Sequence, residues 1–195
     1  MRPSLILAFD TTAAHCAAAL LSGDDLLAVR VDPMAKGQAE HLVGMLNQVL
    51  AGQGLGWSDL TAIGVGIGPG NFTGIRISVA AARGLALGLG IPAIGVSGFD
   101  AAAYGLPRPV TVAISAPRGM AYVQTFTITQ SHDPQLVAVA DIGTAILPGL
   151  VPDLIGATAR IAAHRSISPQ PRPAPLYVRP PDAAPSRDAA PVLLS

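Results

Sequence analysis

Three short apolar runs open the chain, and a helical stripe follows them. The runs cover residues 4–10, 16–21 and 26–31, and polar or turn-forming residues separate them. Apolar runs of that length are typical of buried strands. Over residues 38–51 the apolar positions recur three and four residues apart, which predicts a helix with one buried face. The pattern therefore predicts a strand-rich opening followed by a helix.

The most distinctive stretch is a strand, a glycine-rich turn and a helix in direct succession. Small and β-branched residues over 62–67 predict a strand covered on both faces, and Gly68-Pro69-Gly70 then ends it. Asn71 or Thr73 can cap a helix by accepting a hydrogen bond from its first N–H groups. We expect this helix over residues 74–89.

The helix expected over 74–89 is apolar on nearly every side. Arg76 and Arg83 are its only charged residues, and their spacing of seven puts them on one face. Such a helix must be covered by the sheet on one side and by further chain or another molecule on the other. Its alanines and glycines would let a neighbouring backbone approach closely.

The second half of the chain repeats the opening pattern in a shorter form. Residues 110–115 and 120–129 predict two strands around a turn, like the opening hairpin. We therefore expect two lobes, one over residues 1–105 and a reduced one over 106–195. The fold class predicted is α/β, with mixed sheets flanked by helices. Further elements are expected as a strand at 91–96, a short helix at 97–104, a strand at 136–139, a helix at 153–164 and, over 168–195, proline-rich extended chain draped over the first lobe.

The composition limits the classes of function that fit this chain. Of the 195 residues, 50% are hydrophobic and 12% are charged, and the mean hydropathy is +0.49. So apolar a chain points to a protein that buries surface against a partner. The net charge is zero, which is not typical of a protein that binds nucleic acid without a partner protein.

Localisation is predicted from three features. No apolar run reaches the roughly 18 residues of a membrane span. The chain opens directly into a strand pattern, without an apolar signal segment. Its single cysteine excludes an internal disulfide and fits a reducing compartment. We expect a cytoplasmic protein with no membrane contact.

The glycine-rich turn raises the question of nucleotide binding, because N–H groups at a helix N-terminus suit an anion. Lys36 is the only lysine and lies far from the turn, so there is no Walker A motif. Gly68, Gly70 and Gly74 have the spacing G-x-G-x-x-x-G, which is not the dinucleotide fingerprint. The turn is therefore either a phosphate cradle or a tight turn whose glycines permit close packing, and the spacing favours the second.

Groups for catalysis or metal binding are sparse. Asp10, at the tip of the first strand, could hold a magnesium–phosphate or simply cap the turn at Thr12. His41 is favoured as a solvated or partner-contacting side chain, because no second histidine stands at the spacing of a helical metal pair. Cys16 is expected to be a small buried thiol, since His15 beside it points to the opposite strand face.

Four stretches carry a family resemblance: LAFDTT at 7–12, GQAEHL at 37–42, GPGNFTGIR at 68–76 and LYVRPPDA at 176–183. They resemble the TsaB (YeaZ) family, a Gcp-like branch of the actin/sugar-kinase/Hsp70-type fold. The resemblance covers the first lobe throughout and thins after about residue 115. It implies two actin-like (ribonuclease H-like) lobes, the second reduced. At the second hairpin this chain has Ser115-Ala116-Pro117-Arg118, where the family usually has Asp-Ala-Arg.

The resemblance implies an accessory, non-catalytic subunit in making threonylcarbamoyladenosine at position 37 of tRNAs that read ANN codons. The implied partners are a catalytic TsaD-type paralogue and a TsaE-type ATPase, with a homodimer when the paralogue is absent and tRNA contacted only through the complex. TsaD carries an H-x-x-x-H metal motif, which this sequence lacks. No cofactor of its own is expected, whereas the complex would bind ATP or ADP. The rival interpretations are an ATP-dependent kinase or phosphotransferase of the same fold and a glycoprotease-type peptidase.

Two sets of site residues are expected, and neither is catalytic or metal-binding. A vestigial nucleotide loop would contain Asp10, Thr11, Thr12, Gly68 and Gly70. The partner interface would lie on the two long helices of the first lobe. Its expected residues are His41, Leu42, Met45, Val49, Ile75, Val79, Ala82 and Leu85.

Overall fold

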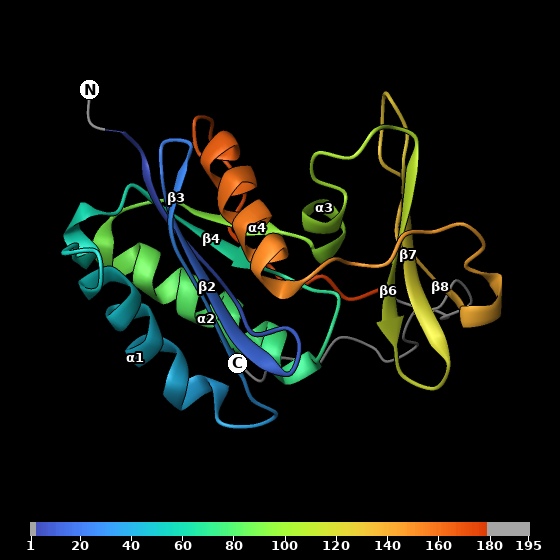
Figure 1. Cartoon of the computed structure of the whole chain (residues 1–195), viewed down its shortest axis with the longest axis horizontal. Coiled ribbons are helices and arrows are strands. Elements are labelled where there is room, and N and C mark those ends of the chain that lie inside the picture. The colour runs from blue at the N-terminus through green and yellow to red at the C-terminus, as the bar shows by residue number, and fades with distance from the viewer. Residues whose placement is uncertain (1–2, 179–195) are drawn as a thin grey trace, which may run out of the picture.

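Two β-sheets organise the chain in the computed structural model, which describes residues 3–178 (Figure 1). One sheet has the strand order β3-β2-β1-β4-β5 and the other has the order β6-β7-β8. The first consists of β1 (Leu5–Asp10), β2 (His15–Ser22), β3 (Asp25–Pro33), β4 (Ala62–Gly66) and β5 (Ala93–Val96). The second consists of β6 (Val110–Ala116), β7 (Met120–Phe126) and β8 (Gln135–Ala138).

The first sheet is mixed. Strands β1, β2 and β3 pair antiparallel, whereas β4 runs parallel to β1 and β5 runs parallel to β4. The second sheet is an antiparallel meander. The helices of the described part are α1 (Gln38–Ala51), α2 (Phe72–Leu89), α3 (Gly98–Ala102) and α4 (Val151–Arg165), with 3₁₀ turns at Trp57–Asp59 and Val139–Asp141. The predicted α/β class with mixed sheets and flanking helices is confirmed.

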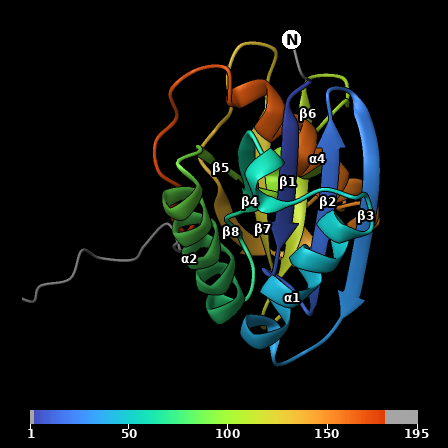
Figure 2. The ribbon, with the colours of Figure 1, turned by 90° about the vertical axis from the view of Figure 1, so that its left-hand side faces the viewer.

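The central strand β1 is buried on both faces. Leu5, Leu7 and Phe9 face the core beneath α1 and α2, while Ile6 and Ala8 face the core beneath α4. This alternation follows from the two-residue period of a strand. Figure 2 shows α1 and α2 lying side by side over one face of the sheet, with α4 behind it. The first sheet is therefore the middle layer of three.

Helix α4 packs on the first sheet although it follows the second sheet in sequence. Ile155, Ala159 and Ala162 belong to the same buried cluster as the side chains of β1 and β2. Gly64 of β4 lets α4 come close, because a Cβ there would lie 2.8 Å from the Cβ of Ala162. The division at residue 105 stays a prediction for the chain as a whole. The helix expected at 153–164, however, joins the layer of the first lobe.

Helix α2 has one buried and one open side. Ala82 and Ala86 lie in the core beneath α1 and α2, whereas the side chain of Leu87 is 82% exposed. By length and composition alone, α2 is a helix that could cross a membrane. Arg76 and Arg83 interrupt its apolar residues, so it is not an unbroken apolar run of that length. Core helices of globular proteins often have this composition, and α2 packs against the sheet.

The second sheet has a small core of its own. Phe99 and Ala103, in and just after α3, pack with Val112 of β6 and Phe126 of β7. Partly buried side chains, among them Ile114 and Tyr122, pack around these four residues. Helix α3 thus lies between the two sheets (Figure 1).

The chain after α4 returns to the first sheet as an extended segment. The N–H of Leu176 donates a hydrogen bond of 2.8 Å to the carbonyl of Ile67, just beyond β4. The ring of Tyr177 stacks on Phe72 with centroids 5.3 Å apart, and its hydroxyl accepts a bond from Nε of Arg76. At Leu176 and Tyr177 the extended segment therefore contacts the first lobe, while Leu176 and Val178 also pack against the small core of the second sheet. Residues 179–195 of that prediction lie outside the described residues.

Candidate functional site

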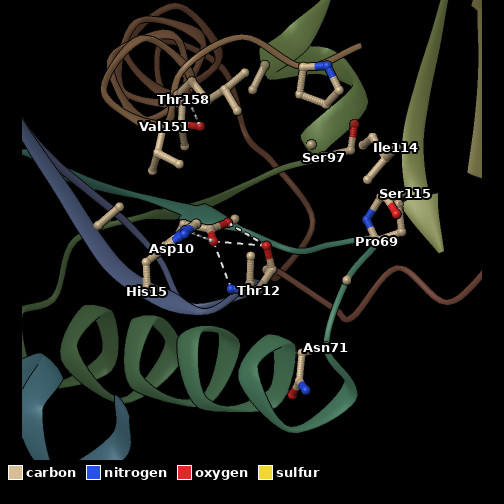
Figure 3. Close-up of a pocket in the computed structure, with 18 of the residues that line it drawn as sticks. Asp10, Thr12, His15, Pro69, Asn71, Ser97, Ile114, Ser115, Val151 and Thr158 are labelled. Atoms are coloured by element: carbon tan, nitrogen blue, oxygen red, sulfur yellow. Dashed lines mark hydrogen bonds and ion pairs between the residues drawn. The ribbon is translucent and has the colours of Figure 1, made fainter. Parts of the chain in front are cut away.

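A cleft of about 770 Å³ opens between the two sheets (Figure 3). Asp10 and Gly66, at the ends of β1 and β4, lie at its floor. Ile114 and Ser115 of β6 approach from one side and Thr158 of α4 from another. Strand ends at the edge of such a sheet are where α/β proteins commonly bind ligands.

The carboxylate of Asp10 is tied to its own turn. The N–H of Thr12 donates to Oδ1 of Asp10 at 2.7 Å, and the hydroxyl of Thr12 donates to the same atom at 2.9 Å. Nε2 of His15 lies 3.2 Å from Oδ1 as well (Figure 3). Of the two roles open to Asp10, the structure displays the capping of the turn at Thr12. This arrangement also includes His15, which the sequence did not associate with the turn.

The glycine-rich turn is filled by the chain's own backbone. The N–H of Asn71 donates a hydrogen bond of 2.6 Å to the carbonyl of Thr12. A side chain at Gly70 would collide with this carbonyl, and one at Gly74 would collide with the carbonyl of Thr11. The hydroxyl of Thr11 donates to the carbonyl of Gly74 at 2.7 Å. These contacts account for the glycines by close packing of two loops, the interpretation that the spacing favoured.

The N-terminus of α2 is capped by Asn71, one of the two predicted capping residues. Oδ1 of Asn71 accepts a hydrogen bond of 2.9 Å from the N–H of Gly74. Helix α2 begins two residues before the predicted start at 74. Because the N–H groups of Asn71 and Gly74 already have protein acceptors, fewer donors remain there for an anion.

Gly66 is a site residue that sequence reasoning missed. A Cβ at this position would overlap Oδ2 of Asp10, so the carboxylate can lie over the strand only if residue 66 has no side chain. The available signal was a glycine inside a buried strand, which often marks the close approach of another group. That group could not be identified before β1 and β4 were known to be neighbours.

Charged side chains hardly contribute to the cleft. No lysine or arginine is among the described residues that line it, and Asp10 is the only carboxylate there. Within residues 3–178 no group of three or more His, Cys, Asp or Glu side chains is placed to hold a metal ion. An anionic ligand would therefore meet the Asp10 carboxylate, with no lysine or arginine in the described lining to offset its charge.

Cys16 lies in the core, as the sequence predicts. Burial, with smaller contributions from Asp32 and Asp10, raises the pKa of its thiol to about 11. Its sulfur contacts Sδ of Met34 at 3.5 Å. A thiol with so high a pKa is almost wholly protonated near neutral pH and is a poor nucleophile.

Most residues expected at the partner interface lie inside the protein. The six that are buried in the described structure are Leu42, Met45, Val49, Ile75, Val79 and Ala82. Their exposure was predicted wrongly, because the apolar stripes of both helices face the sheet. Leu85 is half-buried. His41 is also half-buried, and its Nε2 lies 2.6 Å from a carboxylate oxygen of Asp32.

The outward side of these helices carries other residues. Val43 of α1 is 49% exposed and Leu87 of α2 is 82% exposed. A Cβ built on Gly44, Gly84 or Gly88 would have no atom of the described residues within 4 Å, apart from the backbone of its own helix. We call these five residues the outer face. The sequence could not separate this face from the buried one on α2, which is apolar all round.

The chain was compared with known proteins. A family model described as TsaD, tRNA N6-adenosine threonylcarbamoyltransferase, matches residues 33–162. The tRNA threonylcarbamoyladenosine biosynthesis protein TsaB of Escherichia coli K12 is 35% identical over 122 residues, which are 60% of this chain and 52% of that protein. An uncharacterized protein of Mycobacterium tuberculosis H37Rv is 32% identical over 201 residues, covering 93% of this chain and 95% of its own.

Solved structures give the same fold. YeaZ from Pseudomonas aeruginosa superposes with a TM-score of 0.67 at 23% identity, covering 90% of this chain and all of the other.

A second curated relative, TsaB of Haemophilus influenzae, is 34% identical in sequence over 104 residues, which are 53% of this chain and 43% of that protein. The chain thus spans about half the length of the curated TsaB relatives that it matches.

Proposed function

The chain belongs to the TsaB (YeaZ) family of Gcp-like proteins, and from that membership we propose that it is a non-catalytic subunit in the synthesis of threonylcarbamoyladenosine in tRNA. It pairs with a TsaD-type catalytic paralogue and supports threonylcarbamoyl transfer to adenosine 37 of tRNAs that read ANN codons. The family model that matches is named for the transferase. The H-x-x-x-H motif implied for that enzyme is absent from this sequence, which favours the accessory role.

The outer face of α1 and α2 supports the pairing in this proposal. Glycine inside a helix lowers stability by about 1 kcal/mol relative to alanine. In the described part of the chain, no neighbouring group comes close enough to Gly44, Gly84 or Gly88 to exclude a side chain there. Glycines at such positions permit the backbone of a second molecule to approach closely, and the exposed Leu87 and Val43 beside them supply apolar area.

The partner in this proposal lays its own helices on the outer face. A pair of helices of this length can contribute roughly 800 Å² per partner, which is the size of a standard stable interface. A second copy of this chain occupies the same face when the paralogue is absent. A TsaE-type ATPase joins the complex, tRNA is bound only through the complex, and ATP or ADP is held by the complex and not by this chain alone. We place this assembly in the cytoplasm.

A single substitution tests the interface without disturbing the core. Gly84→Arg adds a long charged side chain where the monomer has open space. The variant should unfold at the same or a higher denaturant concentration than the native protein, because arginine favours helix over glycine by up to about 1 kcal/mol. On size-exclusion chromatography with the TsaD-type paralogue from the same organism, it should no longer co-elute, since the arginine would be buried in the contact.

The matched control is His164→Arg, on an exposed position of α4 at the other side of the sheet. This variant should pair like the native protein. Co-elution of Gly84→Arg with the paralogue would contradict the proposed interface, and loss of pairing by both variants would show that added charge alone prevents it.

A further inference from the structure

The cleft between the sheets has the size and the walls of a small-molecule site. Its volume of about 770 Å³ lies within the range of ligand pockets, roughly 300–1,000 Å³. Val96, Ile114, Tyr122, Leu154 and Ile155 bring apolar side chains to it from both sheets and from α4. The site has no part in the proposed contact with the paralogue, because that contact uses the outer face of α1 and α2.

Polar groups gather at one end of the cleft around Asp10. Oδ1 of Asp10 is contacted by Thr12 and His15, whereas within residues 3–178 Oδ2 accepts a hydrogen bond only from the Thr12 hydroxyl, at 3.2 Å. The close approach to Gly66 sets the position of Oδ2 at the floor of the cleft. A carboxylate oxygen has two lone pairs, so Oδ2 can accept a further hydrogen bond from a ligand.

The same end of the cleft is unfavourable for phosphate. The lining contains no arginine or lysine in the described part of the chain. At the start of α2, the N–H groups of Asn71 and Gly74 already donate to protein oxygens. A phosphate placed there would face the Asp10 carboxylate at short range, and like charges in a partly buried site repel strongly.

We propose that the cleft binds a small organic cation. The apolar body of the ligand lies between β6 and α4, and its protonated amine donates a hydrogen bond to Oδ2 of Asp10. Charge complementarity selects the ammonium group, because Asp10 is the one carboxylate among the described lining residues and no lysine or arginine lies there. The apolar walls exclude water from the contact and so strengthen it.

Three probes of similar size and different charge test this proposal on the full-length chain. They are 2-phenylethylammonium, 2-phenylethanol and 3-phenylpropanoate, with affinities measured by chemical-shift titration. The cation should bind at least about tenfold more tightly than the alcohol, and the anion should bind most weakly. Equal affinities, or tightest binding of the anion, would overturn the proposal. So would binding of Mg·ADP that is tighter than that of the cation.

Two variants and a control locate the site. Asp10→Asn should remove the preference for the cation while the affinity for the alcohol changes little. Asp133→Asn, at an exposed carboxylate outside the cleft, should keep the preference. Ser115→Trp, at the rim, should abolish binding of all three probes by filling the space, so the location can be decided even if Asp10→Asn fails to fold. Unchanged binding to Ser115→Trp would show that the probes bind elsewhere and would contradict the proposal.

Discussion

The main-chain carbonyl of Thr12 accepts a hydrogen bond from the main-chain N–H of Asn71, across 2.6 Å. This contact joins the turn after β1 to the turn that begins α2, and it lies where a bound phosphate would need free donors. The glycines at 70 and 74 let the two backbones come this close. The glycine-rich motif thus has a structural role, whereas the vestigial nucleotide loop stays a prediction.

Gly74→Ala should destabilise the protein. The added methyl group meets the carbonyl of Thr11, a backbone atom in the turn that directly follows β1. Overpacking of this kind costs about 1–3 kcal/mol. Urea unfolding followed by circular dichroism measures the loss, and Gly84→Ala, in open space on the same helix, should instead be as stable as the native protein or more so. Equal stability of Gly74→Ala and native protein would show that the two loops are not held together as described.

Met45→Asp should destabilise the fold, whereas Val43→Asp should leave it intact. Met45 is 1% exposed and Val43 is 49% exposed, two positions apart on α1. An unpaired carboxylate at position 45 would be buried, which costs several kcal/mol, whereas one at position 43 remains in water. Thermal unfolding should therefore show a large loss for Met45→Asp only. Val43→Asp should fold normally and weaken pairing with the paralogue, and a stable Met45→Asp would contradict the placement of α1.

The acid stability of the protein should depend on Asp32. Hydrogen bonds from Arg30, first, and from His41 lower the pKa of this carboxyl below its ordinary value of 3.8. A lowered pKa in the folded state stabilises the fold above the unfolded-state value, and the contribution is lost as the pH falls through the folded value. Below pH 3.8, the free energy of unfolding should fall less steeply with decreasing pH in Asp32→Asn than in the native protein. If the free energy of unfolding had the same pH profile in both proteins, the hydrogen bonds of Arg30 and His41 to Asp32 would not stabilise the fold.

Cys16 should resist thiol reagents in the folded protein. It is fully buried, and the pKa of about 11 leaves almost no thiolate near pH 8. Labelling with a disulfide reagent should be slow in buffer and rapid in denaturing urea. Rapid labelling in buffer would mean that β2 opens or that the thiol is not enclosed by α1 and β2.

Much of the first lobe could be predicted from local pattern. The apolar stripe over 38–51 predicted α1 with the bounds that the structure has, and the runs at 4–10 and 16–21 predicted β1 and β2. The two strands are short apolar runs bounded by polar turns, and the helix has its apolar residues three and four positions apart. The return of α4 to the first sheet has no such local signal, because it depends on tertiary packing of the whole chain.

The site residues were harder to predict than the elements. A helix that is apolar all round does not show which face meets the sheet, so Ala82 was assigned outward and lies in the core. Gly66 needed the register of β1 against β4, which places it beneath Asp10. Both errors concern distances between segments far apart in sequence, and periodicity carries no information about those.

Transfer of the threonylcarbamoyl group to tRNA, reconstituted from purified proteins, tests most directly the claim that this chain supports a TsaD-type catalytic paralogue. Threonylcarbamoyladenosine formed in tRNA is measured by nucleoside mass spectrometry after incubation with the activated threonylcarbamoyl donor and ATP, using the TsaD-type paralogue, the TsaE-type ATPase and this chain. The account predicts product only when this chain and the paralogue are both present, and its loss with Gly84→Arg but not with His164→Arg. Product formed by this chain without the paralogue, or formed equally well by the paralogue without this chain, would contradict it.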